Sequence, residues 1–221
     1  MTFRFSTEGT GFRYLSNQAI RLVLPGVDDP WGAARMFSLS SSPSEAGVLA
    51  VTCRISDTPF KQALARFSHG DAAVIYGPLG SFLLRTDRPV VFLAGGIGIT
   101  PFRGMLRYAA DTGVEQSLTL LYSARTPEEL VFREELDRLV DSTRGGSVHY
   151  SITRPSGPGS PWDGRVGRID AEWIDRVANL GSRPRFYIAG LPGMVTDLVA
   201  LLTERLGVPP DDLDYEIFHG F

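Results

Sequence analysis

The chain has 221 residues, 43% hydrophobic and 21% charged, which suits one large globular domain or two small ones. Its formal net charge of -3 argues against a nucleic-acid-binding protein, and no apolar run approaches the roughly 20 residues of a membrane span. A single cysteine excludes an intrachain disulfide and an all-cysteine iron–sulfur site, and the three scattered histidines suggest no metal site.

The first half of the chain is predicted to form a small antiparallel β-barrel. Short strand-like segments, separated by Gly, Pro, Ser and Asp clusters, occur at 19–24, 36–40, 48–56, 72–76 and 81–84. Arg35, Phe37 and Ser38 lie among them, and in a strand the first two point to one face while Ser38 points to the other. A guanidinium can bind phosphate and an aromatic ring can lie against a flat heterocycle, although an ordinary barrel strand explains the residues equally well.

The second half changes to a pattern of alternating strands and helices. Continuous apolar runs at 90–94, 118–122, 149–152 and 186–189, with a weaker one at 213–217, are typical of buried parallel strands. Helices are expected between them, near 102–110, 127–140, 171–178 and 194–206. We therefore predict a C-terminal α/β domain with a five-stranded parallel sheet, and domains at 1–87 and 88–221.

Three glycines, Gly95, Gly96 and Gly98, follow the first apolar run of this second half. Without Cβ atoms they let backbone amides approach a pyrophosphate, and Thr100 and Pro101 are expected as the N-cap and first residue of the next helix. A plain tight turn is the alternative. A second helix start is predicted as a capping box, with Thr126 as N-cap, Pro127 at the first position and Glu129 at the third.

Taken in order, these segments resemble the ferredoxin–NADP⁺ reductase superfamily over nearly the whole chain. The matching segments are Arg35-x-Phe37-Ser38, 58–64, 77–82, 95–101, 122–125, 190–195 and 215–221. The resemblance implies a flavin-binding barrel domain, an NAD(P)-binding domain, and hydride transfer from NADPH to FAD followed by single-electron transfer to a carrier. Two departures are Ala189, where relatives usually have a cysteine, and residues 2–5, which resemble the second barrel strand of the family rather than the first.

The resemblance also implies roles for individual residues. Ser38 and Glu216 are expected near the reactive N5 of the flavin, and Phe221 over its face, so these three form the expected catalytic set. A solvent-facing Glu216 and a frayed C-terminus are the alternatives. The expected cofactor-binding residues are Arg35, Phe37, Ser38, Cys53, Phe60, Lys61, Gly96, Gly98, Thr100, Pro101, Ser123, Arg125, Thr153, Arg154, Gly190, Met194 and Phe221. For Cys53, we favour a small buried residue of a barrel strand over a redox role.

The choice of cofactors and partners stays open at several points. No carboxylate immediately follows the second strand of the α/β half, whereas Ser123, Arg125 and Arg154 suit a 2′-phosphate, which favours NADPH over NADH. Solvated surface arginines are the alternative. FAD is favoured over FMN, and the expected partner is ferredoxin or flavodoxin. The alternatives are a reductase component of an oxygenase system, a free-flavin reductase, or a non-enzymatic nucleotide-binding regulatory subunit. We expect a cytoplasmic flavoprotein oxidoreductase with neither nucleic acid nor membrane as a partner.

Overall fold

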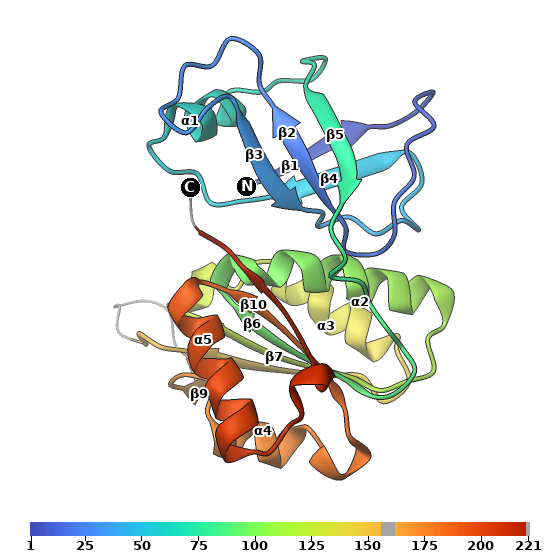
Figure 1. Cartoon of the computed structure of the whole chain (residues 1–221), viewed down its shortest axis with the longest axis vertical. Coiled ribbons are helices and arrows are strands. Elements are labelled where there is room, and N and C mark those ends of the chain that lie inside the picture. The colour runs from blue at the N-terminus through green and yellow to red at the C-terminus, as the bar shows by residue number, and fades with distance from the viewer. Residues whose placement is uncertain (156–161, 220–221) are drawn as a thin grey trace.

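The computed structural model describes residues 1–155 and 162–219 and shows two stacked domains (Figure 1). The N-terminal domain, blue to cyan, holds β1 (Thr2–Ser6), β2 (Ala19–Val23), β3 (Ala34–Ser38), β4 (Val48–Thr52), α1 (Pro59–Ala65) and β5 (Val74–Leu79). Its strands pair antiparallel, as predicted, in a two-stranded sheet β1-β4 and a three-stranded sheet β3-β2-β5. Alternation explains β2, where Ile20 and Leu22 are fully buried and Arg21 is exposed.

The predicted barrel is not closed. Among the described residues, one isolated antiparallel bridge connects the two sheets. It pairs Leu39, just after β3, with Val51 of β4. The strand predicted at 81–84 is absent. Phe82 and Leu84 are instead partly buried in the other domain, against the core on the face of its sheet that is turned towards the N-terminal domain.

The C-terminal domain is built on a parallel sheet in the order β11-β10-β6-β7-β8-β9. The strands are β6 (Val90–Gly95), β7 (Leu118–Ala124), β8 (Ser147–Ile152), β9 (Arg165–Val166), β10 (Arg185–Gly190) and β11 (Leu213–Ile217). The sheet therefore has six strands, and our prediction of five was wrong. The additional strand, β9, has only two residues and so carries no apolar run that a sequence pattern could reveal.

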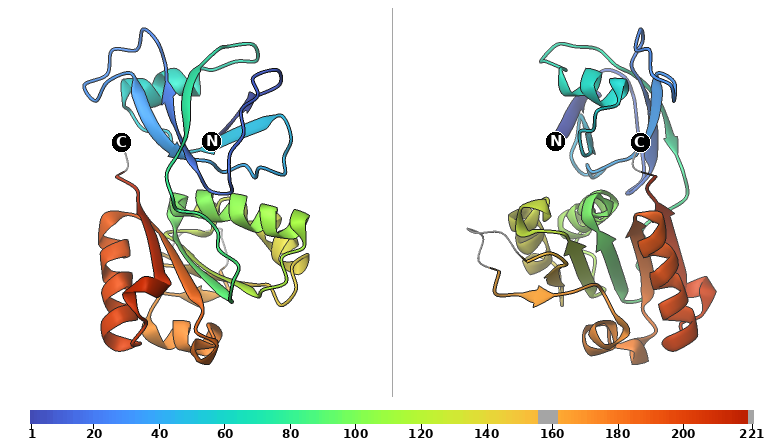
Figure 2. Two further views of the ribbon diagram at one scale, coloured as in Figure 1. Left: turned by 45° about the vertical axis from the view of Figure 1, so that its right-hand side comes forward. Right: turned by 90° about the vertical axis from the view of Figure 1, so that its left-hand side faces the viewer.

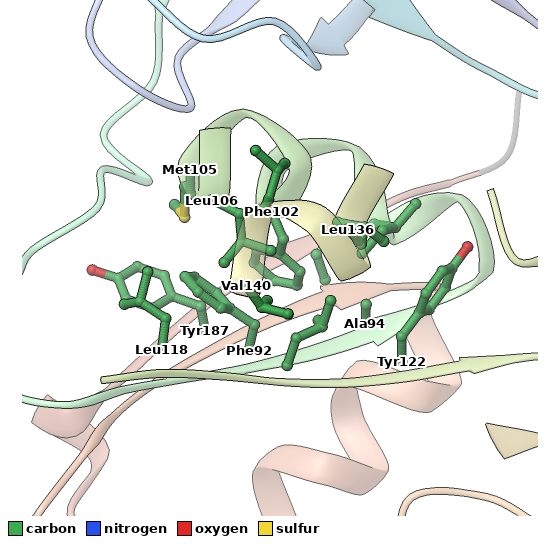
Figure 3. Close-up of a cluster of buried hydrophobic side chains, with 14 of the residues drawn as sticks. Phe92, Ala94, Phe102, Met105, Leu106, Leu118, Tyr122, Leu136, Val140 and Tyr187 are labelled. Atoms are coloured by element: carbon green, nitrogen blue, oxygen red, sulfur yellow. The ribbon is translucent and has the colours of Figure 1, made fainter. Parts of the chain in front are cut away.

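Helices cover both faces of this sheet. α2 (Thr100–Thr112) and α3 (Arg133–Asp141) pack on the face turned towards the N-terminal domain, and α4 (Ala171–Val177) and α5 (Pro192–Ala200) pack on the other (Figures 1 and 2). Short 3₁₀ turns lie at Gly96–Ile99, Pro127–Glu129, Leu180–Ser182 and Pro210–Asp212, and a π-helical turn at Leu201–Arg205 extends α5. Figure 3 shows the core between the sheet and α2 and α3, in which side chains of the two helices contact the sheet residues Phe92, Tyr122 and Tyr187. None of the helices in the described ranges is long and apolar enough to cross a membrane.

The predicted cap at Thr100 was wrong, and the one at Thr126 was confirmed in position but not as a side-chain cap. Thr100 is the first residue of α2 rather than its N-cap, because the 3₁₀ turn from Gly96 leads directly into the helix. Thr126 precedes the 3₁₀ turn Pro127–Glu129 as its N-cap residue, but its side chain makes no capping hydrogen bond. The longer helix predicted here is interrupted at Phe132, whose φ is +65°, and α3 begins only at Arg133. The side-chain caps are instead Thr58 of α1 and Asp170 of α4, which accept from the backbone N–H groups of Lys61 and Trp173.

Two sets of contacts fix the domains against each other. The Tyr187 hydroxyl donates to the carbonyl of Leu83 at 2.8 Å and accepts from the N–H of Arg85 at 2.9 Å, which pins the segment between the domains to β10. Arg103 of α2 donates to the carbonyl of Ser40 at 3.0 Å and pairs with Glu45 and Glu135. Hydrogen-bonded side chains therefore join the two domains at two places.

Candidate functional site

A cleft of about 1050 Å³ lies between the domains, at the carboxyl ends of the parallel strands. The strand order reverses between β6 and β10, the switch point at which open α/β sheets bind ligands. Most of the predicted site residues line this cleft: Arg35, Phe37, Ser38, Cys53, Lys61, Gly96, Thr100, Ser123, Arg125, Thr153, Arg154, Met194 and Glu216. Those that do not line it are Phe60, Gly98, Pro101 and Gly190, while Phe221 lies outside the described residues.

The glycine turn after β6 serves two different purposes. Gly96 lines the cleft with φ of +52°, a left-handed conformation that favours glycine, and a Cβ there would lie 3.3 Å from Nη2 of Arg54. Gly98 faces away from the cleft, and a Cβ there would collide with the carbonyl of Ala189 on β10. Gly98 is thus required by close packing of the turn on the neighbouring strand, whereas Gly96 and Thr100 form the wall that a ligand would touch.

A hydrogen bond between the domains joins Ser38 and Glu216 at the cleft. The Ser38 hydroxyl, at the end of β3, donates to Oε1 of Glu216 on β11 at 2.8 Å. Oε2 of the same carboxyl is enclosed and has no hydrogen-bond partner among the described residues. Burial raises the pKa of Glu216, and the hydrogen bond from Ser38 only partly opposes that effect. A carboxyl with a raised pKa at a cleft is suited to exchange a proton with a bound ligand.

Arg35 lines the cleft, but its guanidinium is engaged inside the N-terminal domain. Nη2 donates to Oδ1 of Asp29 at 2.6 Å, and Nη1 donates to the backbone carbonyls of Trp31, Gly32 and Ala34. Asp29 also accepts from the N–H groups of Phe60 and Trp31. Burial alone would raise the pKa of Asp29, but these N–H donors and the arginine together lower it.

Lys61 differs from Arg35 in the polar contacts of its side chain. Its side chain is 6% exposed, yet it lines the cleft, and Nζ lies 4.8 Å from the centroid of the Phe37 ring. No hydrogen bond or ion pair of its ammonium group occurs among the described residues. Phe60, the preceding residue, is fully buried beneath Arg35 and supports the guanidinium from a distance of 5.0 Å between Cζ and the ring centroid.

At the far end of the cleft, two arginines follow neighbouring strands. Arg125 comes after β7 and Arg154 after β8, and the N–H of Arg154 donates to the carbonyl of Arg125 at 2.8 Å. Within the described part of the chain neither guanidinium forms an ion pair. Ser123 and Thr153 line the same end, so this region offers two cations and two hydroxyl groups to a ligand. These donors match a dianionic phosphate in charge and in hydrogen-bonding capacity.

Sequence reasoning missed an ion pair beside the glycine turn. Arg54, just after β4, pairs with Glu129 across the domains at 2.7 Å, and both line the cleft. The Tyr122 hydroxyl holds the Glu129 segment by donating to the carbonyl of Glu129 and accepting from the N–H of Val131. We had assigned Glu129 to the capping box, and Arg54 lies in no recognisable motif. No sequence signal connects two residues that are 75 positions apart.

The remaining expectations concern Cys53 and metals. Cys53 is a free thiol, 5% exposed, packed in the core of the N-terminal domain at the wall of the cleft. Across residues 1–155 and 162–219, no group of three or more His, Cys, Asp or Glu side chains is arranged to hold a metal ion.

Comparisons with known proteins indicate the family of the chain. Residues 92–200 match the family model described as the oxidoreductase NAD-binding domain. The chain is 33% identical over 213 residues to a protein named ferredoxin–NADP reductase B from Sorangium cellulosum, covering 91% of this chain and 84% of the relative. It is 30% identical to the anthranilate 1,2-dioxygenase electron transfer component of Acinetobacter baylyi, covering 87% of this chain but only 54% of that protein.

Among solved structures, the FAD/NAD-binding domain of a nitric oxide dioxygenase from Vibrio cholerae superposes with a TM-score of 0.82. The match covers 98% of this chain and 91% of the other at 21% identity, so it speaks for the fold alone.

Proposed function

The chain belongs to the ferredoxin–NADP⁺ reductase superfamily, and from this premise we propose that it is a flavin-dependent NAD(P)H oxidoreductase that uses FAD and NADPH. In this proposal, residues 1–87 form the flavin half and residues 88–221 the nicotinamide-nucleotide half. The observation that carries it is the cleft between the domains, where Ser38 of the N-terminal domain faces Glu216, Gly96 and Thr100 of the C-terminal domain. Two ligands bound at these two walls would meet in the middle of the cleft.

The polar groups of the cleft fit such ligands. Lys61 presents a cation to the N-terminal half, Gly96 presents backbone without a side chain next to the start of α2, and Arg125 and Arg154 present two cations. When bound, a flavin supplies the conversion between two-electron and one-electron transfer, which no side chain of this chain can perform.

The contribution of the chain itself is positioning and proton handling. Ser38 and Glu216 hold a hydroxyl and a carboxyl together at the meeting point of the two walls, at an O–O distance of 2.8 Å. Because burial favours the neutral form of Glu216, the pair can keep or release a proton close to the reacting atoms. The contacts of Arg103 and Tyr187 hold the walls at a constant separation, which favours productive alignment.

For the electron acceptor we propose a class of partner rather than one protein. The name of the Sorangium relative supports ferredoxin as the partner, and flavodoxin is proposed as another small carrier of the same kind. The name of the Acinetobacter relative supports a second candidate, the reductase component of an oxygenase system. For the nucleotide, Arg125 and Arg154, which form no ion pair with any other described residue, favour NADPH over NADH, and we expect Arg154 to contact the 2′-phosphate.

Spectroscopy of the purified protein tests the proposal. We expect a visible flavin absorption band, present on purification or after adding FAD, that bleaches when NADPH is added. A protein that stays colourless with added FAD would contradict the proposal and would favour a nucleotide-binding subunit without redox activity. Steady-state rates with NADPH and NADH then test Arg154→Ala, which should weaken the preference for NADPH; an unchanged preference would refute the assignment of Arg154.

A further inference from the structure

We propose that the outer face of the sheet β3-β2-β5 is the surface on which an acidic electron-carrier protein docks. By the outer face we mean the side of this sheet that is turned away from β1 and β4. The proposal rests on the proposed function, because the carrier would receive electrons from a flavin in the cleft. Its support comes from a group of exposed apolar side chains, from Arg21 at their centre, and from their continuity with the cleft.

The strand register brings nine side chains together on this face. Directly opposed residues of antiparallel strands point to the same side of a sheet, and here Arg21 of β2 lies between Met36 of β3 and Tyr76 of β5. The three rows across the sheet are Ser38, Ala19 and Leu79; Met36, Arg21 and Tyr76; and Ala34, Val23 and Val74. Seven of these nine residues are apolar and Arg21 is the only charged one, so the face is an apolar patch around a single cation.

The large apolar side chains of this patch are exposed. Met36 and Tyr76 are 56% and 58% exposed, and Val74 is 42% exposed. Figures 1 and 2 show β1 and β4 on one side of the sheet, and no helix or strand of the described ranges covers the other side. A single exposed apolar residue is ordinary on a protein surface, but a contiguous group of them is typical of an interaction site.

Arg21 indicates the charge of the partner. Its side chain is exposed and forms no hydrogen bond or ion pair with another described residue. A protein that covers the patch would withdraw this guanidinium from water, which is unfavourable unless the protein offers an anion at the same point. None of the nine positions holds an acidic residue, so the anion must come from the partner. The complementary surface therefore carries carboxylates among apolar side chains.

The size of the patch favours a transient complex over a stable dimer. Three strands of about five residues cover about 250 Å² at ordinary strand dimensions, whereas each partner in a stable complex buries about 800 Å². Two copies related by a two-fold axis through the patch would also bring Arg21 against Arg21. A membrane surface is held by several cations rather than one. Weak electron-transfer complexes, by contrast, have characteristically small interfaces.

The patch is continuous with the cleft. Ala19, Met36 and Ser38 belong to both, and the Ser38 hydroxyl donates to Glu216 at 2.8 Å. A carrier seated on the outer face would therefore reach the edge of the cleft beside Ser38 and Glu216, which is where the proposed function locates the reacting atoms. The glycine turn and the arginines expected to bind the nucleotide belong to the other domain, so carrier and nucleotide would approach from different domains.

Carrier docking can be measured with and without turnover. The probes are an acidic ferredoxin and an acidic flavodoxin, and the readouts are the Kd from titration calorimetry and the KM for the carrier during reduction by NADPH. For Arg21→Glu we expect both constants to rise at least about tenfold, because the reversed charge repels the carboxylates of the carrier. For Tyr76→Ser we expect a rise of about five- to thirtyfold, as for truncating an aromatic interface residue.

Two comparisons show whether these effects belong to docking. Reduction of ferricyanide by NADPH needs no docked protein, so its rate and the KM for NADPH should be the same in both variants and in wild type. Rising ionic strength should reduce the effect of Arg21→Glu but not that of Tyr76→Ser, because salt screens only the charge interaction. Arg66→Glu is the matched control, since it reverses an exposed charge at the end of α1, away from the outer face, and should leave the Kd of the carrier near that of wild type (Figure 2).

The outcomes separate this proposal from the proposed function. A wild type that binds neither carrier, or an Arg21→Glu variant that loses no more affinity than Arg66→Glu, would overturn the docking face. A wild-type dimer that Tyr76→Ser dissociates would assign the patch to a second copy, and binding of anionic lipid vesicles through Arg21 would assign it to a membrane; either result also overturns the proposal. If the carrier binds in an Arg21-dependent way but NADPH reduces neither carrier nor ferricyanide, the docking face stands and the proposed function is refuted.

Discussion

Replacing Arg103 with glutamine measures how firmly the two domains are held together. α2 places the guanidinium between Glu45 of the N-terminal domain and Glu135 of α3, with the Arg103 side chain only 9% exposed. Removing one partner of a buried ion pair costs about 3–5 kcal/mol. Glu45 and Glu135 are 12% and 25% exposed and regain some hydration, so we expect a loss at the lower end, about 3 kcal/mol.

Thermal unfolding provides the assay for Arg103→Gln. For a chain of this size, about 3 kcal/mol corresponds to a midpoint lower by roughly 6 to 12 °C. Arg107→Gln is the matched control, because Arg107 lies on the same helix in an exposed pair with Asp111 and should cost less than about 1 kcal/mol. If the two variants unfold within 1 kcal/mol of each other, on the order of the control effect, the cluster does not join the domains as we argue.

The pH dependence of the same variant provides a second check. Burial alone would raise the pKa of Glu45, but hydrogen bonds from Arg103 and from the N–H of Ser42 lower it overall. The stability that this carboxylate contributes is therefore present above the unfolded value, about 4.3, and is lost as the pH falls through the lower folded value. The destabilisation caused by Arg103→Gln should accordingly shrink in acid, and a constant difference across pH would contradict the assignment.

Two further predictions concern the cleft. Glu216→Gln should become more stable relative to wild type as the pH rises from acid to neutral. A carboxyl whose pKa is raised on folding contributes stability below about pH 4.3, and this contribution is lost as the pH rises through the folded pKa. A constant difference in melting temperature between the two proteins from pH 4 to 8 would disprove the raised pKa of Glu216. Glu129→Gln should lower KM for the nicotinamide nucleotide about two- to fivefold, because it releases Arg54 beside Gly96 and removes a carboxylate facing a polyanion. Steady-state kinetics with Glu128→Gln as the control test this, and an equal effect of both variants would indicate only a change in overall charge.

The sequence predicted the α/β half better than the first half, for a physical reason. A strand buried on both faces needs a continuous apolar run, so β6, β7 and β10 could be found from composition alone. Barrel closure instead depends on pairing between distant strands, which no local pattern records. Phe82 lies in a segment that was predicted as a barrel strand, but its ring packs against Phe102 and Tyr187 in the neighbouring domain.

For the site, the positions of the motifs could be predicted from the sequence, but the hydrogen bonds and ion pairs of their side chains could not. Ser38 and Glu216 were expected near the same reacting atom, and the structure joins them directly by a hydrogen bond. The ion pair between Arg35 and Asp29 could not be predicted from the sequence, because it depends on how the loop after β2 folds back towards β3. The roles of these residues in binding stay predictions, and the expected contribution of Phe221 concerns a residue outside the described ranges.

The hydroxyl of Tyr187 has a consequence for recombination between relatives of this protein. It contacts the segment between the domains through the carbonyl of residue 83 and the N–H of residue 85, so these two hydrogen bonds do not depend on the side chains there, provided that residue 85 is not proline. A chimera that joins a foreign N-terminal half to this C-terminal half should therefore keep its domain geometry if the junction preserves the backbone spacing to Tyr187. Inserting or deleting a single residue before position 85 would shift that register and turn one half of the cleft away from the other.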